Sequence, residues 1–325
     1  MNPFTFKPII LIFKTLRVSW LSIILSISTS TPYLPQALSF ADNFQTSQAQ
    51  SEALARSEIE QQHEQAKEEA RKTLVRDAIE SLEETKKALT ALNKGQENEA
   101  LTAIEHATGK INILLARYPE KSILPIDFEV KLIDTAPVII QNIKEISKDA
   151  EKLLGNKNYP EARLLLDILR SEINIRTYNL PLAMYPTALK EAARLLDQKK
   201  INESITELDV AIHTLVVVDQ VLPLPIINAK LMLAMAEEKH EKDREAALKL
   251  MSSTRHELER ARELGYAGKD EEYASLNKAI EALEKQAKSH KKSPFDFSII
   301  KDQLKAFLKR LSESKKTIST QTKIK

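Results

Sequence analysis

The segment LNKGQENEAL at residues 92–101 has two counterparts further along the chain, LGNKNYPEAR at 154–163 and LDQKKINESI at 196–205. In each, an apolar stripe at helical spacing ends in leucine, a short polar stretch follows, and a small residue opens the next apolar stripe. This pattern is typical of two antiparallel helices joined by a tight turn. The sequence therefore predicts three helical hairpins built on one template.

The template extends to both sides of the turn. Counted from its leucine, it has a small residue four positions before and eight after, and aliphatic residues twelve and nineteen after. The equivalent residues are Leu92, Leu154 and Leu196; Ala88, Ala150 and Ala192; Ala100, Ala162 and Ser204; Ile104, Leu166 and Leu208; and Ile111, Ile173 and Leu215. Small residues allow paired helices to approach to about 8–10 Å. The three leucines are unevenly spaced, so we expect local tetratricopeptide-like packing and no regular repeat array.

Composition also favours an all-α fold, because 29% of the residues are charged and only 5% are aromatic. We predict antiparallel helical hairpins packed into a bundle, with a long helix and a C-terminal helical extension. The long helix is expected to follow Pro225 and to bend near Lys242. Residues 122–137 are interpreted as an extended connector between hairpins, and residues 177–186 as a turn fixed by two prolines.

The N-terminus resembles a secretory signal. Three basic residues precede a short apolar run at 18–27, and no acidic residue occurs in 1–41. That run is much shorter than the roughly 20 residues of a membrane-spanning helix. We predict a signal peptide over 1–41, cleaved after Ala41, with no stable membrane span after cleavage. An uncleaved anchor and a misassigned start codon are the alternatives.

The remaining chain is predicted to have four parts. Residues 42–70 form a polar leader, either a frayed helix or disordered, because they hold few large aliphatic residues. Residues 71–290 form the helical domain, and residues 291–314 a Lys-rich terminal helix. Residues 315–325 are expected to be a disordered tail.

Several chemistries are excluded or disfavoured. The chain has no cysteine, so it has no disulfide, thiolate metal site or thiol nucleophile. Loss of residues 1–41 would change the formal net charge from +2 to −1, which does not suit a nucleic-acid partner. The motifs GxSxG, GxxxxGK[ST], GxGxxG and HExxH are all absent. We therefore predict no catalytic residues, no cofactor and no enzymatic activity.

Two E-x-x-H pairs occur, Glu60 with His63 and Glu237 with His240. Di-metal helical bundles use two such pairs, together with two further glutamates on inward-facing helix surfaces. Here the neighbours of both histidines are charged or polar, which is typical of a solvated helix face. No metal site is predicted from these pairs.

His213 is a candidate pH switch. It follows an apolar helical stripe, and Asp209 lies one turn before it. A partly buried histidine beside a carboxylate can titrate near neutral pH. If His213 is buried and neutral in an assembly, its protonation would favour smaller species in acid. The ordinary interpretation is a histidine at the edge of the core.

The stretch from 176 to 220 combines proline, aspartate and aliphatic residues in a specific order. The residues concerned are Tyr178, Pro181, Leu182, Leu189, Leu196, Asp197 and Asp219. This combination resembles the signature of the YfdX family of exported bacterial proteins, and the similarity extends over about 70–288. The resemblance implies an all-helical, oligomer-forming periplasmic protein linked to envelope or acid stress, without established catalytic residues.

Taken with that resemblance, the sequence predicts a non-enzymatic periplasmic protein that forms homo-oligomers. It is expected to bind an unidentified protein or a small apolar ligand. The alternative is a helical metal carrier or a hydrolase of an unrecognised kind.

Overall fold

The computed structural model describes residues 36–267, 271–288, 297–314 and 317–322. The chain divides into two units, Met1–Ala49 and Gln50–Lys325. Most of the predicted signal peptide lies outside the described residues, and its last residues begin helix α1 (Gln36–Thr73). None of the described helices is long and apolar enough to cross a membrane.

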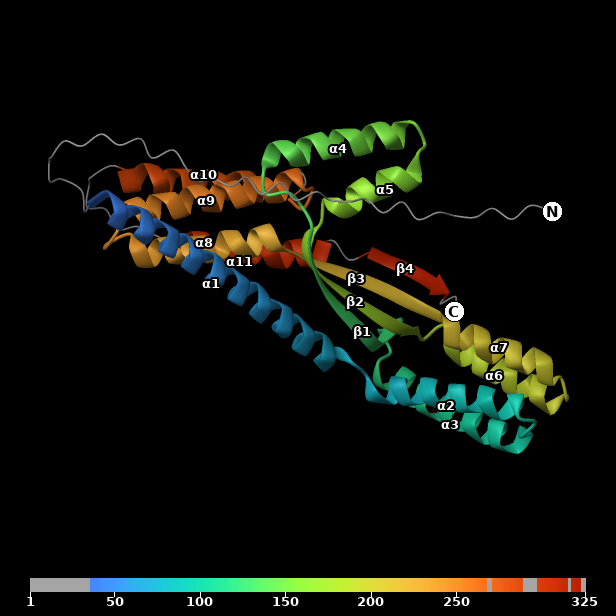
Figure 1. The fold of residues 1–325 in the computed structure, drawn as a ribbon. Coiled ribbons are helices and arrows are strands. Elements are labelled where there is room, and N and C mark those ends of the chain that lie inside the picture. Colours follow the sequence, from blue (N-terminus) through green and yellow to red (C-terminus); the bar gives the residue numbers. More distant parts are fainter. Residues whose placement is uncertain (1–35, 268–270, 289–296, 315–316, 323–325) are drawn as a thin grey trace, which may run out of the picture. The chain divides into compact units, whose positions relative to one another are not determined.

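The three predicted hairpins are confirmed (Figure 1). Their helix pairs are α2 (Arg76–Asn93) with α3 (Glu97–Arg117), α4 (Ile140–Gly155) with α5 (Tyr159–Ile168), and α6 (Tyr185–Asp197) with α7 (Ile201–His213). The described residues are mostly helical, as predicted. The six small template residues near the turns are all buried, as close helix packing requires.

The three turns share one backbone conformation. The residue three positions after the template leucine has a positive φ in each: Gly95 (74°), Lys157 (59°) and Lys199 (62°). The next residue donates its N–H to the carbonyl of the residue before the leucine, with an N···O distance of 2.9 Å in all three turns. This is the hydrogen bond of a Schellman-type helix end. The sequence alignment of the hairpins therefore has a physical counterpart.

Besides the predicted helices, the structure contains an antiparallel sheet that was not predicted. Its strand order is β1-β2-β3-β4. Each hairpin is followed by a strand: β1 (Ile123–Asp134), β2 (Ser171–Pro181) and β3 (Thr214–Pro223). The predicted connector thus contains β1, and the predicted turn begins inside β2. The template residues Ile173 and Leu215 are on strands, whereas Ile111 is on α3. A helical hairpin separates β1 from β2 and β2 from β3 in the sequence, and four helices separate β3 from β4, so no local pattern reveals their pairing.

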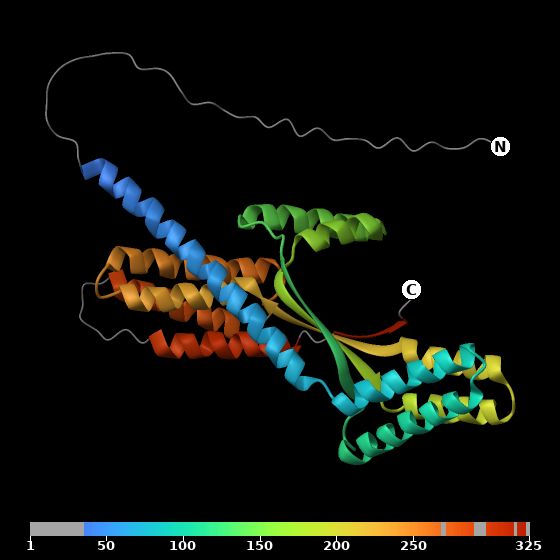
Figure 2. The same cartoon turned by 60° about the horizontal axis from the view of Figure 1, so that its bottom comes forward.

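The first and third hairpins pack against each other as a four-helix bundle (Figure 2). Helix α2 lies against α7, and α3 lies against α6. A buried polar chain joins the two hairpins: the Tyr185 hydroxyl donates to Thr85 Oγ1 at 2.7 Å, and Thr85 donates to the Ser81 carbonyl at 2.9 Å. Burial raises the pKa of Tyr185 above its ordinary value, so the hydroxyl remains a donor.

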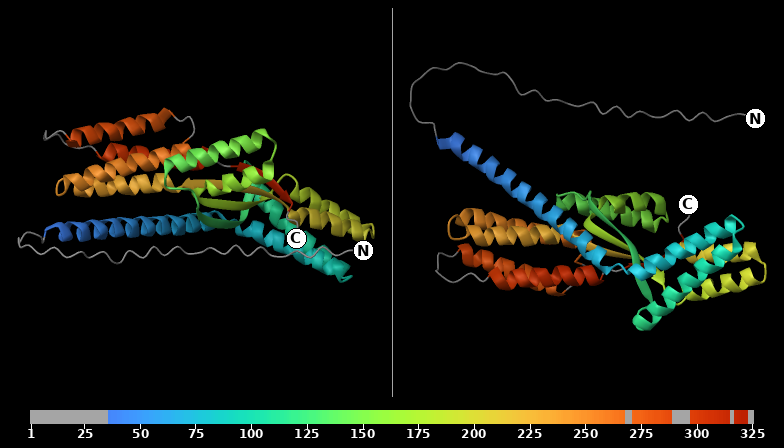
Figure 3. Two further views of the ribbon diagram at one scale, coloured as in Figure 1. Left: turned by 45° about the horizontal axis from the view of Figure 1, so that its top comes forward. Right: turned by 90° about the horizontal axis from the view of Figure 1, so that it is seen from below.

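A second core lies among the C-terminal helices (Figure 3). It is formed by α8 (Leu224–Lys239), α9 (Arg244–Glu263), α10 (Glu271–Lys288) and α11 (Phe297–Ser314). The predicted single long helix is instead the antiparallel pair α8–α9. The break has a local cause, because the Asp243 side chain accepts the N–H of Ala246 at 3.0 Å and so caps the start of α9.

Two polar segments, 42–70 and 315–325, flank the predicted helices. Residues 42–70 belong to α1, the helical alternative of the prediction, and Ala66 in this segment is buried in an apolar cluster with Ile173 of β2. Thr317–Thr322, within the predicted disordered tail, forms β4 along the edge of β3. An exposed strand edge offers unpaired N–H and C=O groups, and a short segment rich in threonine can satisfy them.

Candidate functional site

An apolar groove of about 410 Å³ lies beside the third hairpin. Its lining comes from the end of β2, the first half of α6, the second half of α7 and the first residue of β3. Small side chains such as Ala188 and Ala211 leave room between the helices, while Met184 and Val210 remain largely exposed. An apolar surface accessible to solvent in a concave site is a common feature of small-ligand sites.

Two carboxylates give the groove an acidic character. Glu191 of α6 and Glu207 of α7 both contribute to its lining. The Arg194 guanidinium donates to Glu191 and holds the pKa of that carboxyl below its usual range, so Glu191 stays charged. The Thr214 hydroxyl donates to the Val210 carbonyl at 2.7 Å. The groove can thus hold an apolar body and attract a positively charged group at its rim.

A second cavity, of about 330 Å³, contains His213. The His213 Nδ1 atom lies 2.8 Å from the Asp209 carbonyl oxygen and 3.2 Å from Asp209 Oδ1. The charged groups Glu83, Lys86 and Asp127 line the same cavity. About 27% of the His213 side chain is exposed.

The pH switch proposed for His213 assumed a buried neutral ring, and in the single chain the ring is not fully buried. The structure brings the predicted pair Asp209 and His213 together. Burial of the ring in an assembly, on which the switch depends, stays a prediction.

The family-signature residues have several different environments. Leu182, Leu189 and Leu196 are buried in the four-helix core, and Asp197 is exposed at the end of α6. Tyr178 lines the His213 cavity, whereas Pro181 lines the apolar groove. Asp219 accepts two hydrogen bonds from Arg176, which faces it across the β2–β3 register, at 2.7 and 2.8 Å. Most of the signature therefore shapes the bundle and the sheet around the two cavities.

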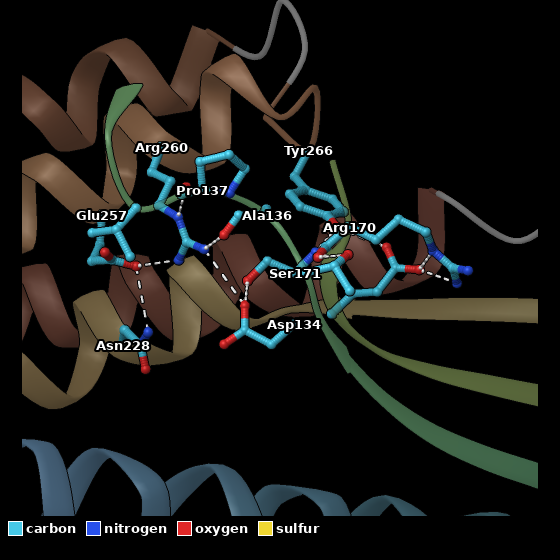
Figure 4. Close-up of polar contacts among 12 residues, drawn as sticks. Asp134, Ala136, Pro137, Arg170, Ser171, Asn228, Glu257, Arg260 and Tyr266 are labelled. Atoms are coloured by element: carbon cyan, nitrogen blue, oxygen red, sulfur yellow. Dashed lines mark hydrogen bonds and ion pairs between the residues drawn. The ribbon is translucent and has the colours of Figure 1, made fainter. Parts of the chain in front are cut away.

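A buried polar network centred on Arg260 was not predicted from the sequence (Figure 4). Arg260 of α9 donates to the carbonyls of Ala136 and Pro137 at 3.0 and 3.1 Å, ahead of α4. It also forms ion pairs with Glu257 at 3.4 Å and Asp134 at 3.5 Å. Burial raises the pKa of Glu257, and the Arg260 charge opposes that rise.

The network continues through Tyr266 (Figure 4). The Tyr266 hydroxyl donates to Glu172 at 2.8 Å and accepts the N–H of Ser171 at 2.9 Å, and Arg170 donates to the same glutamate. These contacts hold α9, and the residues directly after it, against the ends of β1 and β2. Arg260 lies in a helix rich in Arg and Glu, so the sequence does not distinguish this buried arginine from the exposed Arg262 of the same helix.

One E-x-x-H pair lies on α1; in the other, Glu237 is on α8 and His240 directly follows that helix. His63 approaches the Val130 carbonyl, and the His240 ring lies against Phe297 with 5.2 Å between ring centroids. Within the described ranges, no group of three or more His, Asp or Glu side chains is arranged to hold a metal ion.

Fold and site together define a class: helical hairpins carried on a small antiparallel sheet, with an apolar groove beside one of them. Comparison with protein families matches residues 81–221 to the model described as YfdX protein. The resemblance to the YfdX family is thereby confirmed over residues 81–221, which run from α2 to β3. The match is narrower than the predicted range of about 70–288.

Other comparisons add little. No curated protein matches the chain. A solved crystal structure of YfdX from Salmonella Typhi has 13% sequence identity and a TM-score of 0.32, covering 46% of this chain and 93% of that one.

Proposed function

We propose that this chain is a non-enzymatic, exported helical protein that self-associates and binds a small apolar ligand or an apolar segment of a protein. The apolar groove between α6 and α7 carries the proposal. Its floor is made of small side chains, and the apolar side chains of Met184 and Val210 remain exposed to solvent. When a ligand covers exposed apolar surface in a concave site, the free energy of the system falls.

Export and a role in envelope or acid stress are supported by different observations. The basic and apolar pattern of the first 27 residues supports transport to the periplasm. The YfdX region supports the stress role only through what the family resemblance implies.

The polar side chains of the groove support a binding role. The Glu191 carboxylate is paired with Arg194, and the Thr214 hydroxyl is bonded to a backbone carbonyl. General acid–base or nucleophilic catalysis needs a nucleophile within hydrogen-bond reach of a base. Both groups are instead bonded to partners three or four residues away in their own segments.

Binding of the fluorescent probe N-phenyl-1-naphthylamine tests the proposal. Val210→Glu places a charge in the apolar lining and is expected to weaken probe binding about tenfold or more. Thr102→Glu, at an exposed position of α3 that does not line the groove, is the matched control and should leave the affinity unchanged. Equal affinities for Val210→Glu and the original protein would show that the probe binds elsewhere and would contradict the proposal.

A further inference from the structure

The second hairpin uses the shared template but exposes residues that the other two hairpins bury. At the template leucine, Leu92 and Leu196 are 3% and 4% exposed, whereas Leu154 is 42% exposed. Twelve positions later, Ile104 and Leu208 are 1% and 0% exposed, whereas Leu166 is 47% exposed.

The exposed positions lie on one particular face. The small template residues, which face the partner helix within a hairpin, are buried in all three hairpins. Leu92, Leu196, Ile104 and Leu208 all belong to the apolar cluster that joins the first hairpin to the third. In α4–α5 the corresponding face is not packed against either of those hairpins, and Figure 2 shows this hairpin apart from the four-helix bundle; outside its own hairpin, α4 contacts α9.

The packing of the first hairpin against the third shows how such a face can be covered by another hairpin. The first helix of each hairpin lies against the second helix of the other, as α2 on α7 and α3 on α6. That arrangement has approximate twofold character. Two identical hairpins can adopt it with exact twofold symmetry, in which each copy presents the same surface to the other.

Charges at the edge of the face are complementary to this arrangement. Three positions before the template leucine, the bundle has Leu89 and Ala193, and nine positions after it, Leu101 and Ile205. All four pack against the bundle core. The second hairpin has Glu151 on α4 and Arg163 on α5 at these positions, both exposed and without an ion-pair partner in the described part of the chain.

We propose that the exposed α4–α5 face binds the same face of a second copy of this chain, α4 of one copy against α5 of the other. Leu154 and Leu166 then become buried, and Glu151 of each copy faces Arg163 of the other. The inference rests on the self-association in the proposed function and assigns it to one surface.

The available area suits a dimer that depends on concentration. Leu154, Tyr159 and Leu166 share this face and are each about half exposed, which leaves roughly 300 Å² of accessible surface at about 200 Å² for a large side chain. A standard interface buries about 800 Å² per partner. The polar rim must supply the remainder, so the charge pairs should matter for stability as well as for register.

Charge reversal and rescue, followed by sedimentation or light scattering across a dilution series, tests the proposal with purified protein. The original protein should double its mass as concentration rises. Glu151→Arg or Arg163→Glu alone creates two like-charge contacts in the dimer and should weaken association about tenfold or more. The double variant Glu151→Arg/Arg163→Glu restores opposite charges and should recover the original association.

Leu166→Glu and Leu164→Glu provide a second pair. Leu166 lies on the proposed face, so its replacement by glutamate should abolish the dimer. Leu164 is also exposed but lies about half a turn round the same helix, where the other hairpins have Thr102 and Thr206, so its replacement should leave the dimer intact.

Two results would overturn the assignment. If the single charge variants and Leu166→Glu all keep the original mass, copies associate through another surface, and the wider proposal of a self-associating binding protein stands without this interface. A single-chain mass for the original protein at every concentration would refute self-association as well, while probe binding in the α6–α7 groove would still be judged by its own test.

Discussion

The four-helix bundle and the α4–α5 hairpin contain the same local structure in different surroundings. All three hairpins share the turn geometry and the buried small residues. Only the bundle supplies a partner for the template leucine and the aliphatic residue that follows twelve positions later. The comparison separates positions that form a hairpin from positions that join two hairpins, and the predictions below test that separation.

The largest effect is expected at the aliphatic position that joins hairpins. Leu208→Ala removes a fully buried side chain and leaves a cavity, so it should reduce the free energy of unfolding by about 2–5 kcal/mol. Leu166→Ala, at the equivalent exposed position, should cost less than about 1 kcal/mol in the monomer. Urea unfolding at low protein concentration measures both. Similar losses of unfolding free energy for the two variants would contradict the distinction between positions that join two hairpins and positions that do not.

The next effect is expected at the small positions within hairpins. Ala192→Leu and Ala162→Leu each force a large side chain between closely packed helices and should destabilise by about 1–3 kcal/mol. Both variants should be destabilised, because this position is buried with or without a partner hairpin. Thermal unfolding measures the loss, with exposed Thr206→Leu as the control. An unchanged melting temperature for Ala192→Leu would show that the aligned small positions of the hairpins are not sites of close helix packing.

A smaller, pH-dependent effect is expected at Glu257, outside both hairpin types. Its folded-state pKa is raised by burial, so its contribution to stability is complete below the unfolded value, about 4.3, and is lost as pH rises through the folded value. Glu257→Gln keeps an acceptor for Arg260 but cannot ionise. The melting temperature of the original protein relative to Glu257→Gln should therefore fall as the pH is raised from about 4.3 into the range where the folded carboxyl ionises. A constant difference over that range would mean that the glutamate ionises without cost.

The smallest effect is expected at the turns. Lys199 has a left-handed backbone, which is unfavourable for a residue with a Cβ atom, while Gly95 at the equivalent position has no such cost. Lys199→Gly should raise stability by about 0.5–1 kcal/mol, offset in part by the greater freedom of glycine in the unfolded chain. The Lys199 amine also pairs with Glu97 at 2.6 Å, so Lys199→Ala serves as the reference for loss of that exposed pair. Equal unfolding midpoints for Lys199→Gly and Lys199→Ala would argue against strain at the turn.

The hairpins could be predicted because their signals are local. Leu196, Lys199 and Ser204 lie within one turn and its flanks, and the pattern repeats in the other two hairpins. The sheet could not be predicted in the same way, since Arg176 and Asp219 are 43 residues apart in the sequence, with α6 and α7 between them. Strand pairing over such separations leaves no periodic trace in either segment.

The candidate site was predictable only in part. The signature residues Tyr178 and Pro181 point to the right region, because each lines one of the two cavities. The groove itself comes from the absence of bulk at Ala188 and Ala211, and alanines in a helix give no sign of an empty space beside them. Arg260 was missed because burial depends on the segment that covers it, residues 134–137, more than 120 positions earlier.

Hydrogen–deuterium exchange as a function of protein concentration tests the central claim most directly, because it reads every hairpin in one experiment. The account predicts that amides of α4 and α5 become more protected as concentration rises, while those of α2–α3 and α6–α7 stay equally protected throughout. In Leu166→Glu the protection of α4 and α5 should remain at its low-concentration value. Protection of α4 and α5 that does not change with concentration, in a protein whose mass does double, would contradict the claim that the second hairpin completes its template against another copy.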